Sequence, residues 1–254
     1  MRVVGLLLAL VSTDALAWEK FSPGESWDWQ LTDPVDLERK VDVLDLHPEL
    51  VQADILRALK SRGVKAICYV SVGTLEKTSP DRGRFPKEVV GKVYGDWPDE
   101  RFLDIRRLDV LLPLMKARFE VCKALGFDAI EPDNIDVHEN DSGFPVSAGH
   151  VEAYVLALAM AAHELDLAIG QKNLPELTEE LVESLDFAVT ESCFQDGWCE
   201  QMVPYVAAGK AVFDAEYLDR PLDLAAACET AKALGLSMIA KDRDLTRTLR
   251  SCPD

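Results

Sequence analysis

The sequence predicts an α/β fold, a single parallel (β/α)8 barrel of the TIM type, on three observations. Eight apolar, strand-like segments recur along the chain, and each ends in polar residues. Most are followed by a helix-like segment whose apolar residues recur at three- and four-residue steps, which is typical of parallel strands joined by helical crossovers. Neither a G-x-G-x-x-G fingerprint nor a Walker loop occurs, so an open, doubly wound nucleotide-binding sheet is disfavoured.

Residues 1–17 have the features of a secretory signal peptide. A charged start at Arg2 precedes the apolar run Val3–Val11, and Ala15 and Ala17 are the small residues expected before a cut after Ala17. The run falls well short of the ~20 apolar residues that span a bilayer. We therefore expect a secreted or extracytoplasmic protein. Residues 18–254, about 237 in number, should form one barrel domain of the usual size of roughly 250 residues.

The expected strands share an apolar start and a polar carboxyl end. They are Trp27–Leu31, Val41–Leu46, Ala66–Val72, Phe127–Glu131, Leu167–Lys172, Phe187–Glu191, Ala211–Tyr217 and Ser237–Lys241. The expected helices are Val51–Arg62, Leu108–Leu125, Val151–Leu165, Glu176–Leu185, Gln201–Ala208 and Leu222–Leu234. Several of these helices are followed by a glycine, such as Gly63 and Gly126, as a left-handed C-cap requires.

The segment Gly73–Arg107 is too long for an ordinary connection between two elements of a barrel. It contains three prolines, Trp97 and the short apolar stretch Phe102–Ile105. Long loops in compact domains are more often functional than idle. We expect this segment to fold over one end of the barrel.

The six cysteines form an even set in a chain with an oxidising destination, so disulfides are expected. Cys193 and Cys199 flank one short loop and are predicted to pair. A Cys228–Cys252 bond would tie down the C-terminal segment. Cys68 and Cys122 lie in apolar strand and helix contexts, which suit buried free thiols equally well.

The formal net charge of −18 disfavours nucleic acid and anionic membranes as partners, because phosphate repels a protein of this sign. A cationic substrate would be attracted. The alternative is that the acidity only keeps an exported protein soluble. We expect a monomer that needs no cofactor.

Acidic residues concentrate in the stretch Gly126–Asp136, where an apolar strand runs into a dense set of carboxylates. The alternative is an ordinary acidic loop in which Asp133 or Asn134 caps the next helix. In a barrel of this type the site lies at the carboxyl ends of the strands. The polar residues expected there are Asp45, His47, Tyr69, Ser71, Glu76, Glu131, Asp133, Asn134, Asp136, Gln171, Lys172, Asn173, Glu191, Asp214, Glu216, Tyr217, Lys241 and Asp242.

Carboxylates dominate this set, and paired carboxylates across a cleft suit the cleavage of glycosidic bonds. No Ser lies in a G-x-S-x-G elbow, and no H-E-x-x-H motif or EF-hand loop occurs, which disfavours acyl transfer and metalloprotease chemistry. Aromatic residues suited to stacking on sugar rings, or equally to core and rim packing, are Trp29, Trp97, Trp198 and Tyr217.

Several motifs in fixed order carry a resemblance to a known family. They are Trp-Asp-Trp-Gln-Leu at Trp27–Leu31, Cys-Tyr-Val-Ser-Val-Gly at Cys68–Gly73 followed by Glu76 and Pro80-Asp81, Phe-Leu-Asp-Ile-Arg at Phe102–Arg106, Glu-Pro-Asp-Asn-Ile-Asp at Glu131–Asp136, Lys172-Asn173, Thr-Glu-Ser-Cys at Thr190–Cys193 and Lys-Ala-Val-Phe-Asp-Ala-Glu-Tyr at Lys210–Tyr217. Over nearly all of residues 18–254 the chain resembles glycoside hydrolase family 114, the endo-α-1,4-polygalactosaminidases.

The resemblance implies a secreted (β/α)8 enzyme that cuts partly or fully deacetylated, hence cationic, galactosamine polymers of microbial exopolysaccharide. It implies Asp133 and Glu191 as the two catalytic carboxylates. The chain departs from the common family forms at Thr190, Ser192 and Gln171, and it lacks an arginine between Glu76 and Asp81. These changes keep both carboxylates and bear on the sugar preference. The residues expected to contact the polysaccharide are Trp29, Asp45, Tyr69, Glu76, Asn134, Asp136, Lys172, Trp198, Glu216 and Tyr217.

Two other functions remain open at this point. A non-catalytic sugar-binding barrel would keep the aromatic residues and the acidic cleft, and would tolerate loss of Asp133 or Glu191. A metal-dependent hydrolase would use Asp133, Asp136, His138 and Glu139 as ligands.

We predict no metal and a retaining hydrolase, with Asp133 as the nucleophile on the strand end that Pro132 stiffens. Glu191 would be the acid/base, with a pKa raised by burial or by the charge of Asp133. A structural ion pair is an equally good expectation for Lys172.

Overall fold

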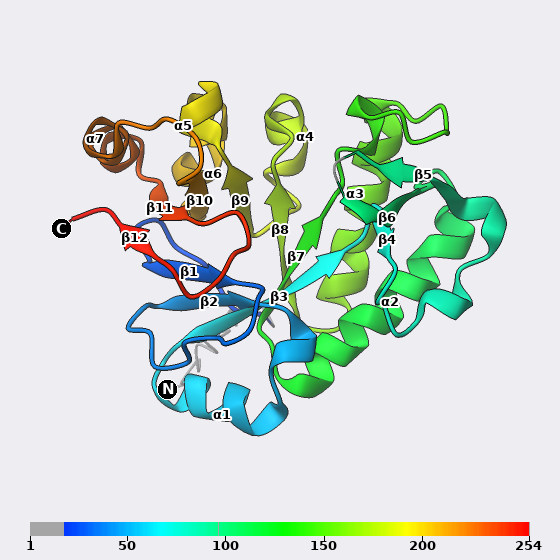
Figure 1. The fold of residues 1–254 in the computed structure, drawn as a ribbon, viewed down its shortest axis with the longest axis horizontal. Coiled ribbons are helices and arrows are strands. Elements are labelled where there is room, and N and C mark those ends of the chain that lie inside the picture. The colour runs from blue at the N-terminus through cyan, green and yellow to red at the C-terminus, as the bar shows by residue number, and fades with distance from the viewer. Residues whose placement is uncertain (1–17, 96, 254) are drawn as a thin grey trace, which may run out of the picture.

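The computed structural model describes residues 18–95 and 97–253, and the expected signal peptide lies outside them. Within these residues, eight parallel strands form a curled sheet in the order β1-β2-β3-β7-β8-β9-β10-β11, and the short antiparallel strand β12 (Arg250–Ser251) pairs with β11 (Figure 1). Their bounds are Trp27–Gln30 (β1), Val43–Leu46 (β2), Lys65–Ser71 (β3), Ala129–Asp133 (β7), Ala168–Lys172 (β8), Phe187–Glu191 (β9), Val212–Tyr217 (β10) and Ser237–Lys241 (β11). All eight overlap expected strands, which confirms the predicted fold class, although β7 begins and ends two residues later than expected.

In the described part of the chain, seven α-helices lie between or after these strands. They are α1 (Ala53–Ser61), α2 (Leu108–Leu125), α3 (Ala148–His163), α4 (Thr178–Leu181), α5 (Cys193–Asp196), α6 (Val203–Ala207) and α7 (Leu224–Leu234). Helix α2 ends at Gly126, whose φ of 107° lets its N–H reach the carbonyls of Cys122 and Lys123. Asp223 caps the N-terminus of helix α7, where its side chain accepts a hydrogen bond from the N–H of Ala226. The two helices expected at Glu176–Leu185 and Gln201–Ala208 are shorter than predicted, because each begins as a 3-10 turn, at Pro175–Leu177 and Cys199–Met202.

The apolar residues form two separate layers. The larger layer lies between strands and helices, and the second fills the inside of the barrel with Trp27, Ile67, Phe187 and Phe213. Gly170 on β8 also faces this interior, where a Cβ would lie 2.5 Å from the Phe187 ring. Side chains therefore fill the barrel core, so a ligand site is expected at an end of the strands rather than inside the barrel.

The long segment after β3 forms a small antiparallel sheet. Its strands are β4 (Thr74–Glu76), β5 (Val90–Tyr94) and β6 (Trp97–Leu103), in the order β4-β6-β5. It stands beside the carboxyl end of β3 and β7 (Figure 1). Gly73 connects the small sheet to β3. It lies so close to Asn134 that a Cβ on residue 73 would be 1.6 Å from the Asn134 carbonyl oxygen. Only glycine fits here, and this contact fixes the small sheet against the end of β7.

Three disulfides link the cysteines: Cys68 to Cys122, Cys193 to Cys199, and Cys228 to Cys252. The two predicted pairs are confirmed. Cys68 and Cys122 are bonded to each other, joining β3 to α2. Three disulfides are consistent with an extracellular protein. In the described part of the chain, no helix has both the length and the apolar character needed to cross a bilayer.

Candidate active site

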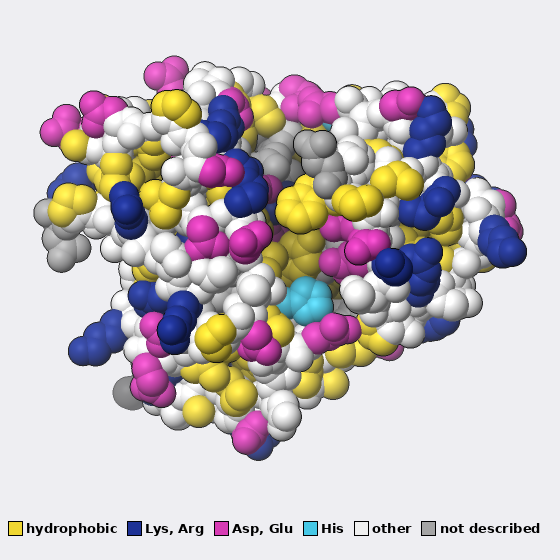
Figure 2. Space-filling model, in the orientation of Figure 1, with side chains coloured by type: hydrophobic (Ala, Val, Ile, Leu, Met, Phe, Trp, Pro, Cys, Tyr) yellow, Lys and Arg dark blue, Asp and Glu magenta, His cyan; other side chains and the backbone are white. Residues whose placement is uncertain are grey.

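A cavity of about 570 Å³ opens at the carboxyl ends of the parallel strands. Figure 2 shows acidic side chains gathered around a central hollow. The polar and aromatic residues that line the cavity are Trp29, Thr32, His47, Tyr69, Glu76, Tyr94, Trp97, Glu100, Asp133, Asn134, Asp136, Lys172, Asn173, Glu191, Tyr217, Arg243, Asp244 and Thr246. Six carboxylates thus face two permanent cations, Lys172 and Arg243, so the cavity attracts positive charge.

The ammonium group of Lys172 lies at the centre of the cavity floor. Its Nζ is 2.7 Å from Glu131 Oε1, 2.9 Å from Asp133 Oδ1 and 3.2 Å from Glu191 Oε2. It also lies 4.4 Å from the centre of the Trp29 ring. Burial alone would lower the pKa of Lys172, but the three surrounding carboxylates raise it well above its usual range. Lys172 is therefore a fixed positive charge that joins the ends of β7, β8 and β9.

A tyrosine holds each of the two candidate catalytic carboxylates from the other side. The Tyr69 hydroxyl donates to Asp133 Oδ2 at 2.9 Å, and the Tyr217 hydroxyl donates to Glu191 Oε1. Burial, followed by the charge of the neighbouring carboxylate, raises the pKa of both tyrosines, so each stays a donor at neutral pH. The side chain of Asp133 is 17% exposed and that of Glu191 is 27% exposed, so both reach the cavity.

The shared contact with Lys172 limits the distance between Asp133 and Glu191. Asp133 Oδ1 and Glu191 Oε2 both contact Lys172 Nζ, so the distance between these two oxygens cannot exceed the sum of the two contacts, about 6 Å. Retaining glycosidases have carboxyl groups ~5–5.5 Å apart, whereas inverting enzymes need ~6.5–9.5 Å to admit a water. The limit of about 6 Å for the two oxygens that contact Lys172 lies below the separation that inverting enzymes need.

The residue directly after each of the strands β7, β8 and β9 has a left-handed backbone conformation. Asn134 follows β7 with φ 61°, Asn173 follows β8 with φ 49°, and Ser192 follows β9 with φ 58°. Asn134 donates to Ser71 Oγ at 3.1 Å, and Asn173 Oδ1 accepts the backbone N–H of Glu191 at 2.9 Å. Such backbone turns are uncommon outside glycine and cluster at functional sites. Here they end the strands abruptly and aim Asp133, Lys172 and Glu191 at one point.

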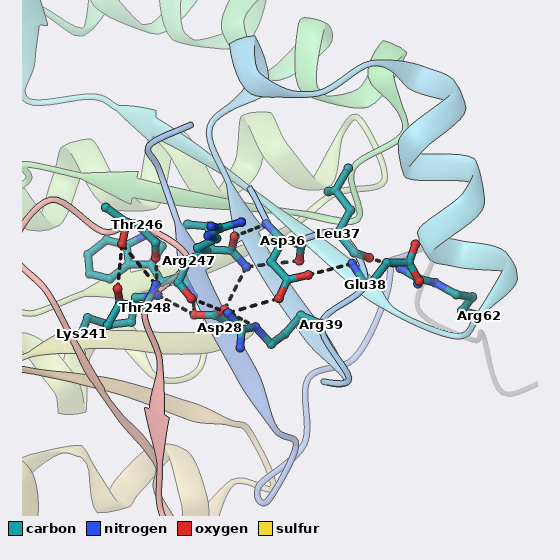
Figure 3. Close-up of polar contacts among 12 residues, drawn as sticks. Asp28, Asp36, Leu37, Glu38, Arg39, Arg62, Lys241, Thr246, Arg247 and Thr248 are labelled. Atoms are coloured by element: carbon teal, nitrogen blue, oxygen red, sulfur yellow. Dashed lines mark hydrogen bonds and ion pairs between the residues drawn. The ribbon is translucent and has the colours of Figure 1, made fainter. Parts of the chain in front are cut away.

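One wall of the cavity is the segment after β11, which also closes the barrel. Within the described residues β1 and β11 share no backbone ladder, and side chains join them instead. Figure 3 shows buried Asp28 of β1 between Arg39 and Lys241, at 3.0 and 2.6 Å. Lys241 also donates to the Thr246 carbonyl at 2.8 Å. These contacts hold residues 243–246 at the rim of the cavity.

A buried pair of acids, Asp45 and Glu131, lies beneath Lys172. Neither oxygen of Asp45 has a donor among the described residues, and Glu131 Oε2 also lacks one. A hydrogen bond between the two carboxyls satisfies them only if one carries a proton. Burial raises the pKa of Glu131 to about 7 and raises that of Asp45 well above its usual range. Because Glu131 contacts the Lys172 ammonium, we infer that Asp45 keeps the proton and donates to Glu131.

Replacing Asp45 by Asn is therefore expected to stabilise the protein relative to wild type increasingly as pH rises. Unfolded Asp45 releases its proton above its ordinary pKa of 3.8, whereas the folded state keeps it, so wild-type stability falls as pH rises from there through the folded pKa. The amide introduced at position 45 would donate to Glu131 at every pH. Denaturant unfolding at pH 4 and pH 7 measures the effect. Asp54→Asn, at an exposed position of α1, is the matched control, and a pH-independent difference for Asp45→Asn would contradict the inference.

Of the residues expected to act in catalysis or to contact the polysaccharide, three do not line the cavity. Asp45 lies fully buried under the floor. Glu216 is buried beside α5, where it accepts the backbone N–H groups of Phe194 and Gln195 at 2.7 and 3.1 Å. Trp198 packs against the outer core beside the Cys193–Cys199 disulfide. These positions give Asp45, Glu216 and Trp198 structural surroundings and keep them away from a ligand in the cavity.

Other cavity residues were missing from the expected set of polysaccharide contacts. Tyr94 and Glu100 come from the small sheet, and Arg243, Asp244 and Thr246 come from the closing segment. Burial raises the pKa of Glu100 to about 7, and Arg243 lies over the Tyr217 ring at 3.6 Å. His47 and Asn173 were expected at strand ends and do line the cavity. The sequence pattern of apolar strands did not identify the residues from the small sheet and the closing segment as cavity residues, because none of them ends a parallel strand.

The expected alternative metal site does not form from its four residues. Within the described part of the chain, His138 gathers with Glu139 and Glu176, and the group does not include Asp133 or Asp136. His138 Nε2 lies 3.1 Å from Glu176 Oε1. Asp133 is held instead by Lys172 and Tyr69, which are donors that a metal ligand set would not contain. The residues present do not fit the metal-dependent hydrolase.

Comparisons with known proteins show the family and the fold of the chain. The structure of Aspergillus fumigatus Ega3 in complex with galactosamine matches with a TM-score of 0.86 and 27% sequence identity, over 92% of this chain and 97% of that one. The glycoside hydrolase domain of PelA from Pseudomonas aeruginosa shares the fold at a TM-score of 0.69 and 14% identity, over 90% of this chain and 98% of that one. A search of curated protein sequences found no significant match. The model of glycoside-hydrolase family GH114 matches residues 8–254, so the chain belongs to this family and is a glycoside hydrolase.

Proposed function

We propose that the protein is a secreted, endo-acting hydrolase that cleaves α-1,4 linkages in cationic, galactosamine-containing polysaccharide and retains the anomeric configuration. The observation that carries the proposal is the Lys172 ammonium, which brings Asp133 and Glu191 together inside an acidic cavity. The similarity to Ega3, whose structure holds galactosamine, supports an amino sugar as the substrate. The disulfides and the features of residues 1–17 support secretion.

The surroundings of the two carboxylates support a division of roles between them. Asp133 is the less exposed, and it is fixed by Lys172 and Tyr69, which suits the nucleophile that attacks the anomeric carbon. Glu191 is the more exposed and more easily reaches the glycosidic oxygen, so it donates the proton to the leaving sugar. It then removes a proton from the water that hydrolyses the glycosyl–Asp133 intermediate. When water breaks the bond between the sugar and Asp133, Lys172 stabilises the carboxylate that is released.

The acidic cavity also sets the substrate charge. Glu76, Glu100, Asp136 and Asp244 surround the reaction centre and would attract the ammonium groups of a deacetylated polymer. An acetyl group removes that charge. A fully N-acetylated polymer should therefore be a poorer substrate than the deacetylated one.

The test is to incubate the purified protein with α-1,4-galactosamine polymers of different acetylation. We expect oligosaccharides of intermediate length to appear early from the deacetylated polymer, and NMR to show the retained anomer first. We also expect KM to rise with salt, because salt screens exposed charges over a Debye length of about 8–10 Å near physiological strength. A KM that does not respond to salt would count against charge attraction. Polymer binding without cleavage would favour a non-catalytic sugar-binding barrel.

A further inference from the structure

A second cavity of about 220 Å³ adjoins the catalytic cavity. His47, Tyr69 and Glu76 line both and form a common rim. The His47 and Tyr69 rings lie 5.8 Å apart, and Tyr69 donates to Asp133 across this rim. The volume is below the roughly 300–1,000 Å³ of pockets for drug-sized ligands, so it suits one small group or ring. A polymer lying in the catalytic cavity would place a neighbouring unit here.

The second cavity differs from the first in charge. Its carboxylates are Glu49, Glu76 and Asp81, opposite Arg84 and Arg118. Asp81 is neutralised by a two-pronged contact with Arg118, at 2.8 Å to Nε and 2.7 Å to the terminal nitrogen. Arg118 also donates to the Ser71 carbonyl at 2.7 Å, so this ion pair is fixed in place. An ammonium group would find no excess of negative charge beyond the rim.

The remaining wall is mostly apolar, with Ser71, Thr78 and Ser79 as its polar members. Pro48, Val70, Pro80 and Val121 line it, together with Cys122 of the Cys68–Cys122 disulfide. Val121 is 54% exposed on α2, although it is a large apolar residue. Burying a methyl group against such a wall is favourable, whereas burying an ammonium group without a partner is costly.

We propose that this second cavity binds an uncharged, N-acetylated sugar unit of the polymer, at a fixed position from the bond that is cut. The inference rests on the proposed function and refines it. The catalytic cavity selects a cationic unit, and the adjoining cavity selects an acetamido unit through its apolar wall. The enzyme would then read the acetylation pattern of a partly deacetylated chain.

The experiment uses a partly N-acetylated α-1,4-galactosamine polymer, cut in ¹⁸O-labelled water to mark the new reducing ends. Tandem mass spectrometry of the products gives the acetylation at each position from the cut. We expect the wild-type protein to enrich acetyl groups at one position. Val121→Glu places a carboxylate in the apolar wall, and it should remove this enrichment. It should also lower kcat/KM for the partly acetylated relative to the fully deacetylated polymer by roughly tenfold, the scale on which apolar pockets discriminate.

Two controls separate the possible failures. Met160→Glu adds the same charge at a 68% exposed position of α3 that lines neither cavity, and it should behave as wild type. Activity of Val121→Glu on the fully deacetylated polymer verifies that the variant folds. Random acetylation around the cut in wild type, or an unchanged bias in Val121→Glu, would overturn this inference and leave the proposed function standing. If wild type does not cut the deacetylated polymer, the proposed function fails and this inference fails with it.

Discussion

Asp133→Asn and Glu191→Gln should each abolish turnover of the galactosamine polymer while leaving the fold and polymer binding largely intact. An amide at position 133 cannot attack the anomeric carbon, and an amide at position 191 cannot transfer the proton to the leaving oxygen. The loss of a positioned acid or base alone costs roughly 10²–10⁴-fold in rate. Reducing-end assays at saturating polymer measure kcat, and the binding of each inactive variant is measured separately.

Asp136→Asn is the comparison for both variants. Asp136 lines the same cavity, but its Oδ2 faces Asn140 at 3.4 Å rather than Lys172. Its replacement removes one negative charge from the wall and should act mainly on KM. The role assignment fails if Glu191→Gln still hydrolyses the polymer at a near-normal rate.

Lys172→Met should both destabilise the protein and stop turnover. Lys172 and Glu131 have side chains that are 1% and 0% exposed, so removing the cation leaves a buried charge without its partner. Breaking a buried pair in this way costs about 3–5 kcal/mol. Asp133 and Glu191 would also lose the charge that holds them together. Chemical denaturation and polymer hydrolysis measure the two effects.

A double variant, Lys172→Met with Glu131→Met, separates stability from catalysis. Apolar replacement of both partners of a buried ion pair is often neutral, so most of the stability should return. Turnover should remain lost, because Asp133 and Glu191 still lack the cation. If the double variant recovered activity together with stability, Lys172 would be a structural residue only.

The sequence predicted the strands well because each is an apolar run that ends in polar residues. Asp133, Lys172 and Glu191 each end such a run, and parallel strands bring their ends to one rim whatever the helices do. Predicting that Asp133, Lys172 and Glu191 meet at one site therefore required the positions and order of the strands, and no information about the helices.

The same rule misplaced Asp45 and Glu216, because it does not say whether a side chain at a strand end reaches the surface. Both point into buried polar pairs, Asp45 toward Glu131 and Glu216 toward Asp214. Tyr94 and Glu100 could not be predicted, since the register of β5 against β6 includes two irregular steps that no periodic pattern records. Arg243 and Asp244 depend on the buried Asp28–Lys241 contact, which joins residues 213 positions apart.

The cavity is built by two sheets that are independent of each other. Asp133, Lys172 and Glu191 belong to the barrel, whereas Glu76, Tyr94 and Glu100 belong to the small sheet β4-β6-β5, which is attached to it beside Gly73. Under the proposed function, the barrel carries the groups that break the bond, whereas the small sheet carries Glu76 and Glu100, two of the four acids that would attract the substrate. Redesign of the small sheet can change which sugars the enzyme accepts while the strand ends that break the bond stay as they are. Altered polymer preferences should accordingly be easier to evolve or engineer between residues 74 and 103 than in the barrel strands.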